Sequence, residues 1–296
     1  MLKGWLIINE FWSSPKVKAL SERLIISASE MGHELKKMTN SEVLSKISLN
    51  ENGIIQIKGV NYPDFVLFWD KDVGLARLLE EMKIPLFNSS KSIEICDSKA
   101  RTIIELANCS IKMPQTMIGP LRYVSENHIG TEFLEEAIDS LNFPFVAKEC
   151  FGSFGEQVYL INNMDKAIWF SKFIKNRPFI FQEYIKSSNG KDLRIYMVGN
   201  EPIASIIRIN NQDFRANYGK YAKANKYKPS KQQIEMAVKA SKKLGIDFGG
   251  IDILFGEDDE PIFCEANSNA HFSKLEQTTN TNVAGAILKH IIKKVM

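Results

Sequence analysis

The sequence predicts an α/β protein in which a first lobe with a parallel sheet precedes a region of mixed α+β structure. In residues 1–95, apolar runs of strand length alternate with segments of helical periodicity, which is typical of βαβ units. From about residue 95, pairs of strands joined by short turns appear between the helices. The 296 residues are too many for one small core and suit two or three closely packed subdomains.

The first lobe begins with an apolar strand, "GWLIIN", at residues 4–9. Ser14 and Pro15 are residue types that favour a helix N-cap and the first helical position, and Gly32 is typical of a helix end. The later elements of this lobe are expected to be a strand at 64–69, a helix at 74–82 and a strand at 84–88. The lobe has no GxGxxG motif, so a dinucleotide site has no support.

The second region is expected to start with a helix at residues 97–109. The elements expected after it are a helix at 133–141, two strands within 143–161, a helix at 165–175, a strand at 178–185, a hairpin at 192–210, a helix at 230–245 and strands at 249–255 and 261–267. Gly199 and Asn200 are typical of the hairpin turn. Ser230 and Gln233 have capping-box spacing, which makes the helix at 230–245 the best signalled in the chain.

Charge and cysteine usage exclude several classes of protein. The net charge of +3 is small and spread along the chain, which gives no argument for binding nucleic acid or a membrane surface. The four cysteines form no CxxC pair, which argues against a disulfide framework and a zinc ribbon. No apolar run approaches the roughly 20 residues of a membrane span, and the apolar stretch at the N-terminus is too short for a signal peptide. We therefore expect a cytoplasmic protein.

The stretch "CEANSN" at 264–269 contains a candidate metal site. Glu265 and Asn267 face the same side of a strand, because they are two residues apart. A hairpin that closes around Asp258 and Asp259 would place Asp252 directly opposite Glu265, although Pro261 leaves a longer or bulged turn open. Oxygen ligands of this kind suit Mg²⁺ or Mn²⁺. Alternatively, the two carboxylates belong to separate ion pairs at strand ends.

Three further segments could bind a nucleotide. Lys148 ends an apolar strand, and the glycine-bearing loop 152–155 follows it, where N–H groups could surround phosphate oxygens. An ordinary β-turn explains the same residues. The segment 182–185, "QEYI", could face an adenine edge, or it could be the end of an amphipathic strand. Arginines at 194, 208 and 215 could clamp anionic oxygens or form a solvated face.

Taken in order, these segments resemble the ATP-grasp superfamily, and in detail its RimK-type, alpha-L-glutamate-like carboxylate–amine ligases. The resemblance runs from about residue 84 to the C-terminus, and rests on Lys148, the glycine loop, "QEYI", "DLRIYMVG", Arg208, "FRAN", "GGIDIL" and "CEANSN". It implies a pre-ATP-grasp domain at 1–95 and two α+β subdomains that clasp ATP, at 96–186 and 187–296. The middle subdomain would carry the glycine loop as a lid, and the last one the metal site.

The resemblance also implies roles for individual residues. Those implied to contact ATP are Lys99, Lys148, Gly152, Ser153, Gly155, Gln182, Glu183, Tyr184, Ile185, Asp192, Arg208, Arg215, Ala216 and Asn217. Among them, Lys148, Arg208 and Arg215 are the implied catalytic residues. Asp252, Glu265 and Asn267 match the metal ligands of the family, which usually hold two Mg²⁺ or Mn²⁺ ions.

The implied reaction is ATP-dependent formation of an amide through an acyl-phosphate. The substrates usual in the family suggest that glutamate or another amino acid is joined to a peptide, protein, cofactor or small metabolite. A non-catalytic ATP-binding protein that acts through partners is the alternative, and a phosphotransferase that stops at the phosphorylated product is a third. Relatives are often dimers or tetramers, which leaves a homo-oligomer open.

The sequence departs from the family pattern at two places. Gly219 stands alone where the family often has a Gly-Gly pair, and "SNAHFSKLE" replaces a common Ser-Pro-Gly after the metal ligands. Residues 269–272 are where the second substrate would be expected. His271 could contact that substrate or help to deprotonate its amine, or it could be structural.

Overall fold

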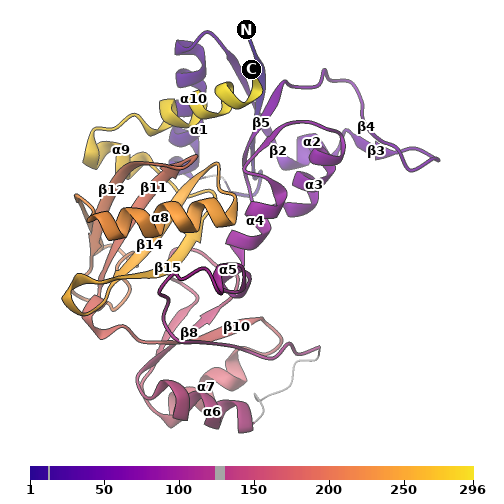
Figure 1. Cartoon of the computed structure of the whole chain (residues 1–296). Coiled ribbons are helices and arrows are strands. Elements are labelled where there is room, and N and C mark those ends of the chain that lie inside the picture. Colours follow the sequence, from indigo (N-terminus) through magenta and orange to yellow (C-terminus); the bar gives the residue numbers. More distant parts are fainter. Residues whose placement is uncertain (13, 124–130) are drawn as a thin grey trace.

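The computed structural model describes residues 1–12, 14–123 and 131–296, and contains three main sheets (Figure 1). The first sheet is parallel, with the order β2 (Glu34–Thr39), β1 (Lys3–Ile8), β5 (Phe65–Trp69) and β6 (Leu86–Phe87). The helices of this lobe are α1 (Pro15–Glu30), α2 (Asn40–Leu44) and α3 (Val73–Glu81). A small hairpin of β3 (Ile47–Leu49) and β4 (Ile55–Ile57) extends from it.

Both faces of the first sheet are buried, as expected for a parallel sheet. Along β1, Leu6 and Ile8 contribute to one hydrophobic core, while Trp5 and Ile7 contribute to another on the opposite face. The second of these cores, which includes side chains of α3, is built from residues of the first lobe. The first of them includes α1 and also residues from the C-terminal part of the chain.

The middle lobe is an antiparallel sheet packed against two helices. Two helices, α4 (Ser90–Asp97) and α5 (Lys99–Leu106), lead into it. The sheet has the order β7 (Thr116–Ile118), β10 (Phe179–Glu183), β8 (Phe145–Glu149) and β9 (Val158–Ile161), and α6 (Thr131–Leu141) and α7 (Met164–Phe173) cover it. Four fully buried phenylalanines form the centre of its core, at positions 145, 170, 179 and 181.

The C-terminal region is a five-stranded antiparallel sheet. Its strand order is β13 (Lys223–Lys226), β12 (Glu201–Ile209), β11 (Lys191–Val198), β14 (Phe248–Phe255) and β15 (Pro261–Asn267). Short 3₁₀ turns lie at Lys186–Ser188 and Glu257–Asp259, and the helices are α8 (Lys231–Leu244), α9 (Ser273–Thr279) and α10 (Val283–Val295). α8 lies against this sheet, while α10 lies beside α1 in the first lobe (Figure 1).

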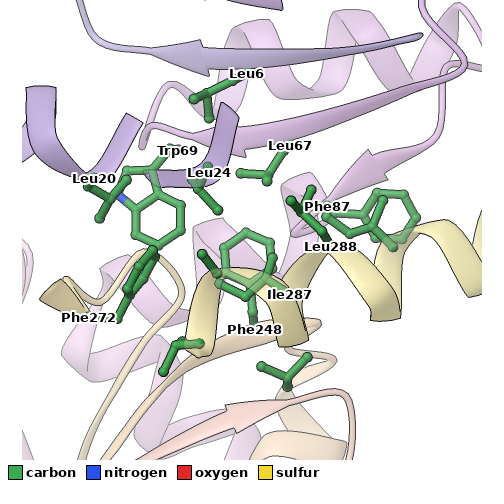
Figure 2. Close-up of a cluster of buried hydrophobic side chains, with 14 of the residues drawn as sticks. Leu6, Leu20, Leu24, Leu67, Trp69, Phe87, Phe248, Phe272, Ile287 and Leu288 are labelled. Carbon is green, nitrogen blue, oxygen red and sulfur yellow. The ribbon is translucent and has the colours of Figure 1, made fainter. Parts of the chain in front are cut away.

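The first lobe and the C-terminal region share one hydrophobic core (Figure 2). The indole ring of Trp69, at the end of β5, stacks on the ring of Phe248 in β14, with 5.4 Å between the ring centroids. The fully buried side chain of Asn88 adds polar contacts across the same junction. It donates to the carbonyl oxygens of Phe248 and Ser268 and accepts from the N–H groups of Asp247 and Phe248. These contacts join the two regions into one body.

The expected α/β fold class is confirmed, and most elements lie where the sequence indicates. The hairpin of β11 and β12 turns at Gly199 and Asn200, and α8 has the capping box of Ser230 and Gln233 with Gly245 in a left-handed conformation at its end. The sequence prediction did not include the strands β2, β3, β4, β7 and β13 or the helices α2, α4, α9 and α10. β2, "ELKKMT", is an edge strand with Leu35 and Met38 as its two buried residues, so its apolar alternation is weak.

Candidate active site

A row of charged side chains crosses four strands of the C-terminal sheet. The register pairs Arg208 of β12 with Asp192 of β11, and Arg194 of β11 with Asp252 of β14. Asp252 is in turn paired with Glu265 of β15. Because Asp192 and Arg194 are two residues apart on one strand, they face the same side. The sheet register therefore gathers five charges on one surface.

The arginines and aspartates of this row form a network that is buried except at Arg194, which is partly exposed. Arg208 donates twice to the carboxylate of Asp192, at 2.6 Å, and once to that of Asp252, at 2.9 Å. Arg194 makes a two-point contact with Asp252, at 2.7 and 2.6 Å. Burial opposes ionisation of Asp252, but the charges and hydrogen bonds of the two arginines outweigh it and hold its pKa at about 2. Asp252 is therefore an anion at neutral pH.

Three oxygen-bearing side chains lie at the end of this row. The predicted pairing of Asp252 with Glu265 is present, and Asn267 pairs with Gly250 two residues further along. The register shifts after Asp252, so that Cys264 is the extra residue of a bulge. The carboxylate of Glu265 has a lysine ammonium, that of Lys99, 4.0 Å away, and within the described residues the amide of Asn267 has no hydrogen-bond partner.

This donor set fits a hard divalent cation. Carboxylate and amide oxygens are the protein ligands of Mg²⁺, and the free oxygens of Glu265 and Asn267 leave room for it to keep water and phosphate oxygens. No group of three or more His, Cys, Asp or Glu side chains in the described part of the chain is placed to hold a metal ion. Two carboxylates and one amide are therefore the candidate ligands, and the metal assignment of these residues stays a prediction.

A cavity between the middle and C-terminal sheets brings the predicted nucleotide residues together. All fourteen residues assigned to ATP contact from the sequence line it, and so do Asp252 and Glu265. Asn267 lines a second cavity next to the first. At one wall, the ammonium of Lys148 donates to the side-chain oxygen of Gln182 at 2.6 Å, and the amide of Gln182 donates to Thr116. This chain of hydrogen bonds fixes the lysine inside the cavity.

The glycine loop folds over this cavity. Gly152 and Gly155 have backbone φ values of 149° and 75°, which residues other than glycine rarely adopt. The guanidinium of Arg215 donates to the carbonyl oxygen of Gly155 at 2.7 Å and pairs with Asp213 at 2.7 Å. In this conformation, the predicted ATP contact Arg215 therefore ties the loop to the segment between β12 and β13.

The second cavity, of about 440 Å³, lies between the first lobe, the glycine loop and the segment after β15. It shares five lining residues with the first cavity, among them Arg208, Glu265 and Phe154 of the loop. The rings of Trp12, Phe154 and His271 meet at this cavity, with centroid distances of 5.1 Å for Trp12–His271 and 6.3 Å for Trp12–Phe154. These contacts connect the loop to the first lobe.

His271 is half-buried in this aromatic cluster, and both of its ring nitrogens are shielded from solvent. Within the described residues, neither of its ring nitrogens has a hydrogen-bond partner. Burial, with the nearby charges of Lys16 and Arg194, lowers the pKa of its imidazole to about 4. The ring is therefore neutral at pH 7 and can offer one donor and one acceptor to a molecule in the cavity.

Several residues at these cavities were not among the predicted site residues. Arg194 was noted in the sequence but was not assigned to the site, and its position two residues after Asp192 was the signal that places it in the row. Asn9, Trp12, Asp70 and Lys71 belong to the first lobe and line the second cavity. No local motif marks these four residues, because their proximity to β15 arises from packing between the lobes.

The match of this sequence to a protein-family model identifies the family. The RimK-like ATP-grasp domain matches residues 96–291. The chain belongs to the RimK-like ATP-grasp family. The uncharacterized protein MG012 of Mycoplasma genitalium is 36% identical over 229 residues, which cover 76% of this chain and 79% of that protein. Human N-acetylaspartylglutamate synthase A is 32% identical, over 74% of this chain and 55% of the human protein, so the chain spans about half of that relative's length.

Another relative of this RimK-like chain has the name of a ligase. A probable alpha-L-glutamate ligase of Legionella pneumophila is 27% identical over 92% of this chain and 91% of its own length. These relatives confirm the expected enzyme class, a ligase. Two solved structures share the fold over nearly the whole of both chains: D-alanine–D-alanine ligase of Bacillus anthracis complexed with ATP, with a TM-score of 0.74 and 16% identity, and the ATP-grasp ligase PsnB complexed with minimal precursor, Mg and ADP, with a TM-score of 0.70 and 16% identity.

In the described part of the chain, none of the helices has the length and apolar character required to cross a membrane. The longest of them, α1, has 16 residues and a mixed surface of buried and exposed side chains.

Proposed function

We propose that the protein is an ATP-dependent carboxylate–amine ligase that joins an amino acid to a second substrate through an acyl-phosphate. One observation carries this proposal: the residues assigned to ATP from the sequence line one cavity, and this cavity meets a second one at Arg208 and Glu265. A nucleotide in the first cavity would place its phosphates toward a substrate in the second. The names of the relatives support an amino acid, glutamate in particular, as one of the substrates.

In this proposal, ATP occupies the first cavity. The segment from Gln182 to Ile185 faces the adenine, and Asp192 lies on the ribose side. Lys99 and Lys148 face the phosphates from two different elements, α5 and β8. Lysine ammonium groups act there as point charges toward phosphate oxygens. The Mg–ADP and ATP complexes of structural neighbours support this choice of nucleotide.

Asp252, Glu265 and Asn267 would hold Mg²⁺ or Mn²⁺, with two ions as the expected number. When bound, these ions neutralise negative charge on the phosphates and on the group that is transferred. Arg208 stands between the two cavities with its guanidinium buried, and is placed to stabilise charge on the γ-phosphate and on the acyl-phosphate. The arginine stays ionised because Asp192 and Asp252 both accept hydrogen bonds from it.

The substrate carboxylate would attack the γ-phosphate, and the amine of the second substrate would then displace phosphate to form the amide. The acyl-phosphate is sensitive to water between these two steps, so the site must be closed. The glycine loop supplies the cover, since Phe154 reaches Trp12 and His271 on the far side of the second cavity.

Release of ADP tests the proposal. Purified protein is incubated with ATP, Mg²⁺ and pairwise combinations of the twenty common amino acids with a panel of carboxylates that includes citrate and N-acetylaspartate. We expect ADP release that requires both members of a pair, together with an amide product by mass spectrometry. Glu265→Gln is the inactive control, and Glu235→Gln, on the exposed face of α8, is the matched control that keeps activity. ATP binding without ADP release under any pairing would contradict the ligase proposal.

A further inference from the structure

The buried carboxylates of the described residues differ in whether a cationic side chain lies next to them. Five aspartate or glutamate side chains belong to residues that are less than a tenth exposed: Asp70, Glu149, Asp192, Asp247 and Asp252. Four of them have a cationic side chain within 3 Å, namely Arg177 for Glu149, Arg208 for Asp192, Lys294 for Asp247 and Arg194 for Asp252. Asp70 has no ion-pair partner within 4.0 Å in the described part of the chain.

The surroundings of Asp70 leave its charge uncompensated. It follows the last residue of β5, and its two oxygens accept from the amide of Asn9, at 3.1 and 3.2 Å, and from the N–H of Lys71, at 2.7 Å. The ammonium of Lys71 contacts Asp97 instead. Burial is the main reason why the pKa of Asp70 is raised, and the neighbouring charge of Asp72 adds to it. Burial of a carboxylate without a cation lowers the stability of the folded protein. Because the fold itself gains nothing from this arrangement, we look to function for its reason.

Asp70 lines the second cavity, so the missing cation can come from a ligand. The same cavity is also lined by three cationic side chains, Lys71, Arg194 and Arg208, which outnumber its two carboxylates, Asp70 and Glu265. A ligand with an ammonium group alone would meet these three positive charges. A zwitterion, with an ammonium toward Asp70 and a carboxylate toward the cations, matches both signs. The volume of about 440 Å³ is in the range of small-molecule sites.

We propose that Asp70 binds the ammonium group of a free amino acid in the second cavity, and so contributes to the choice of substrate. This inference rests on the proposed ligase function and deepens it. Asn9 is a positioning residue in this arrangement, because its amide holds both oxygens of Asp70. The neutral imidazole of His271 and the ring of Trp12 line the same cavity on the side opposite the glycine loop, which contacts both rings through Phe154.

A first experiment measures binding without turnover. The melting temperature of the wild-type protein is measured in the presence of a non-hydrolysable ATP analogue, Mg²⁺ and each of the twenty amino acids. The amino acid that gives the largest increase is then compared with its desamino analogue, for example L-glutamate with glutarate. We expect an increase with the amino acid that its desamino analogue does not reproduce. No increase with any amino acid, or equal increases within the pair, would overturn the inference.

A second experiment compares variants. Asp70→Asn keeps the shape of the side chain and removes its charge, while Asp247→Asn does the same at a buried carboxylate outside both cavities. A lost charge-assisted hydrogen bond predicts an increase of about tenfold to a hundredfold in KM for the amino acid in Asp70→Asn, with KM for ATP within about threefold of wild type. In Asp247→Asn, we expect both KM values to remain those of the wild type.

The outcomes separate the inference from the proposed function. If wild type releases ADP with an amino acid and Asp70→Asn keeps the same KM for it, the role of Asp70 is wrong and the ligase function stands. If wild type releases no ADP, the ligase function fails, and the amino-acid pair in the melting experiment still decides whether an ammonium group is recognised. The melting temperature of ligand-free Asp70→Asn checks that its KM change does not come from unfolding.

Discussion

Substitution of Asp252 is expected to lower both activity and stability, whereas substitution of Glu265 should lower activity alone. Asp252→Asn removes the anion that Arg194 and Arg208 share. Glu265→Gln instead changes a carboxylate whose side chain is 27% exposed and which has the ammonium of Lys99 4.0 Å away. Both residues are proposed metal ligands. We expect both variants to lose Mg²⁺-dependent ADP release, and Asp252→Asn alone to lose substantial stability.

The structure sets the size of this difference. Removal of one partner from a buried ion pair costs about 3–5 kcal/mol, and the lower end applies because Arg208 keeps its contact with Asp192. At about 2 °C for each kcal/mol in a chain of this length, Asp252→Asn should melt about 6 °C below wild type. The partly exposed pair of Glu265 is worth about 0.5 kcal/mol, so Glu265→Gln should melt within about 1 °C of wild type.

Thermal unfolding followed by circular dichroism in metal-free buffer measures this effect, and ADP release measures activity. Equal melting temperatures for wild type and Asp252→Asn would refute the assignment of Asp252 as the shared anion of the two arginines. An active Glu265→Gln with unchanged dependence on Mg²⁺ would refute its role as a metal ligand. The two measurements are independent, so either part of the reasoning can fail alone.

Three further predictions concern the junction and the loop. Asn88→Ala leaves four buried backbone groups without a partner and should lower the free energy of unfolding in urea by about 3 kcal/mol; a loss below about 1 kcal/mol would contradict the accounting of its hydrogen bonds. His271 has a folded-state pKa of about 4, below its unfolded value, so wild type should lose about 2 kcal/mol relative to His271→Phe as the pH falls from 6.5 to 4, and a pH-independent difference would exclude this linkage. Phe154→Ala removes the ring that meets Trp12, so ADP release without the amine substrate should rise relative to wild type, and an unchanged ratio of coupled to uncoupled release would remove the loop from the closure of the site.

The sequence predicted the parts of the site that depend on local pairing. Asp252 and Glu265 lie on strands joined by a short connection, so the register between them follows from the chain itself. The bulge at Cys264 was not predictable, although Pro261 indicated that the ladder would be irregular. The pairing of β11 with β14 brings Arg194 to Asp252 across 58 residues, and a non-local contact of this kind has no sequence signature.

The same distinction explains the residues of the second cavity. Trp12 and Asp70 follow two strands of the first lobe, while His271 follows the last strand of the C-terminal sheet. Their proximity depends on the shared core of the two regions, in which Trp69 stacks on Phe248. That core could not be read from periodicity, because periodicity indicates which face of an element is buried and not which element covers it.

The shared core also determines when the protein can fold during its synthesis. The first lobe leaves the ribosome before the C-terminal region does, and the core between α3 and its sheet can form from residues 5–93 alone. The opposite face of that sheet needs side chains as late as Ile291. An apolar surface of the first lobe therefore stays uncovered until the residues of α10 have emerged, and this is the stage at which we expect chaperones to bind it.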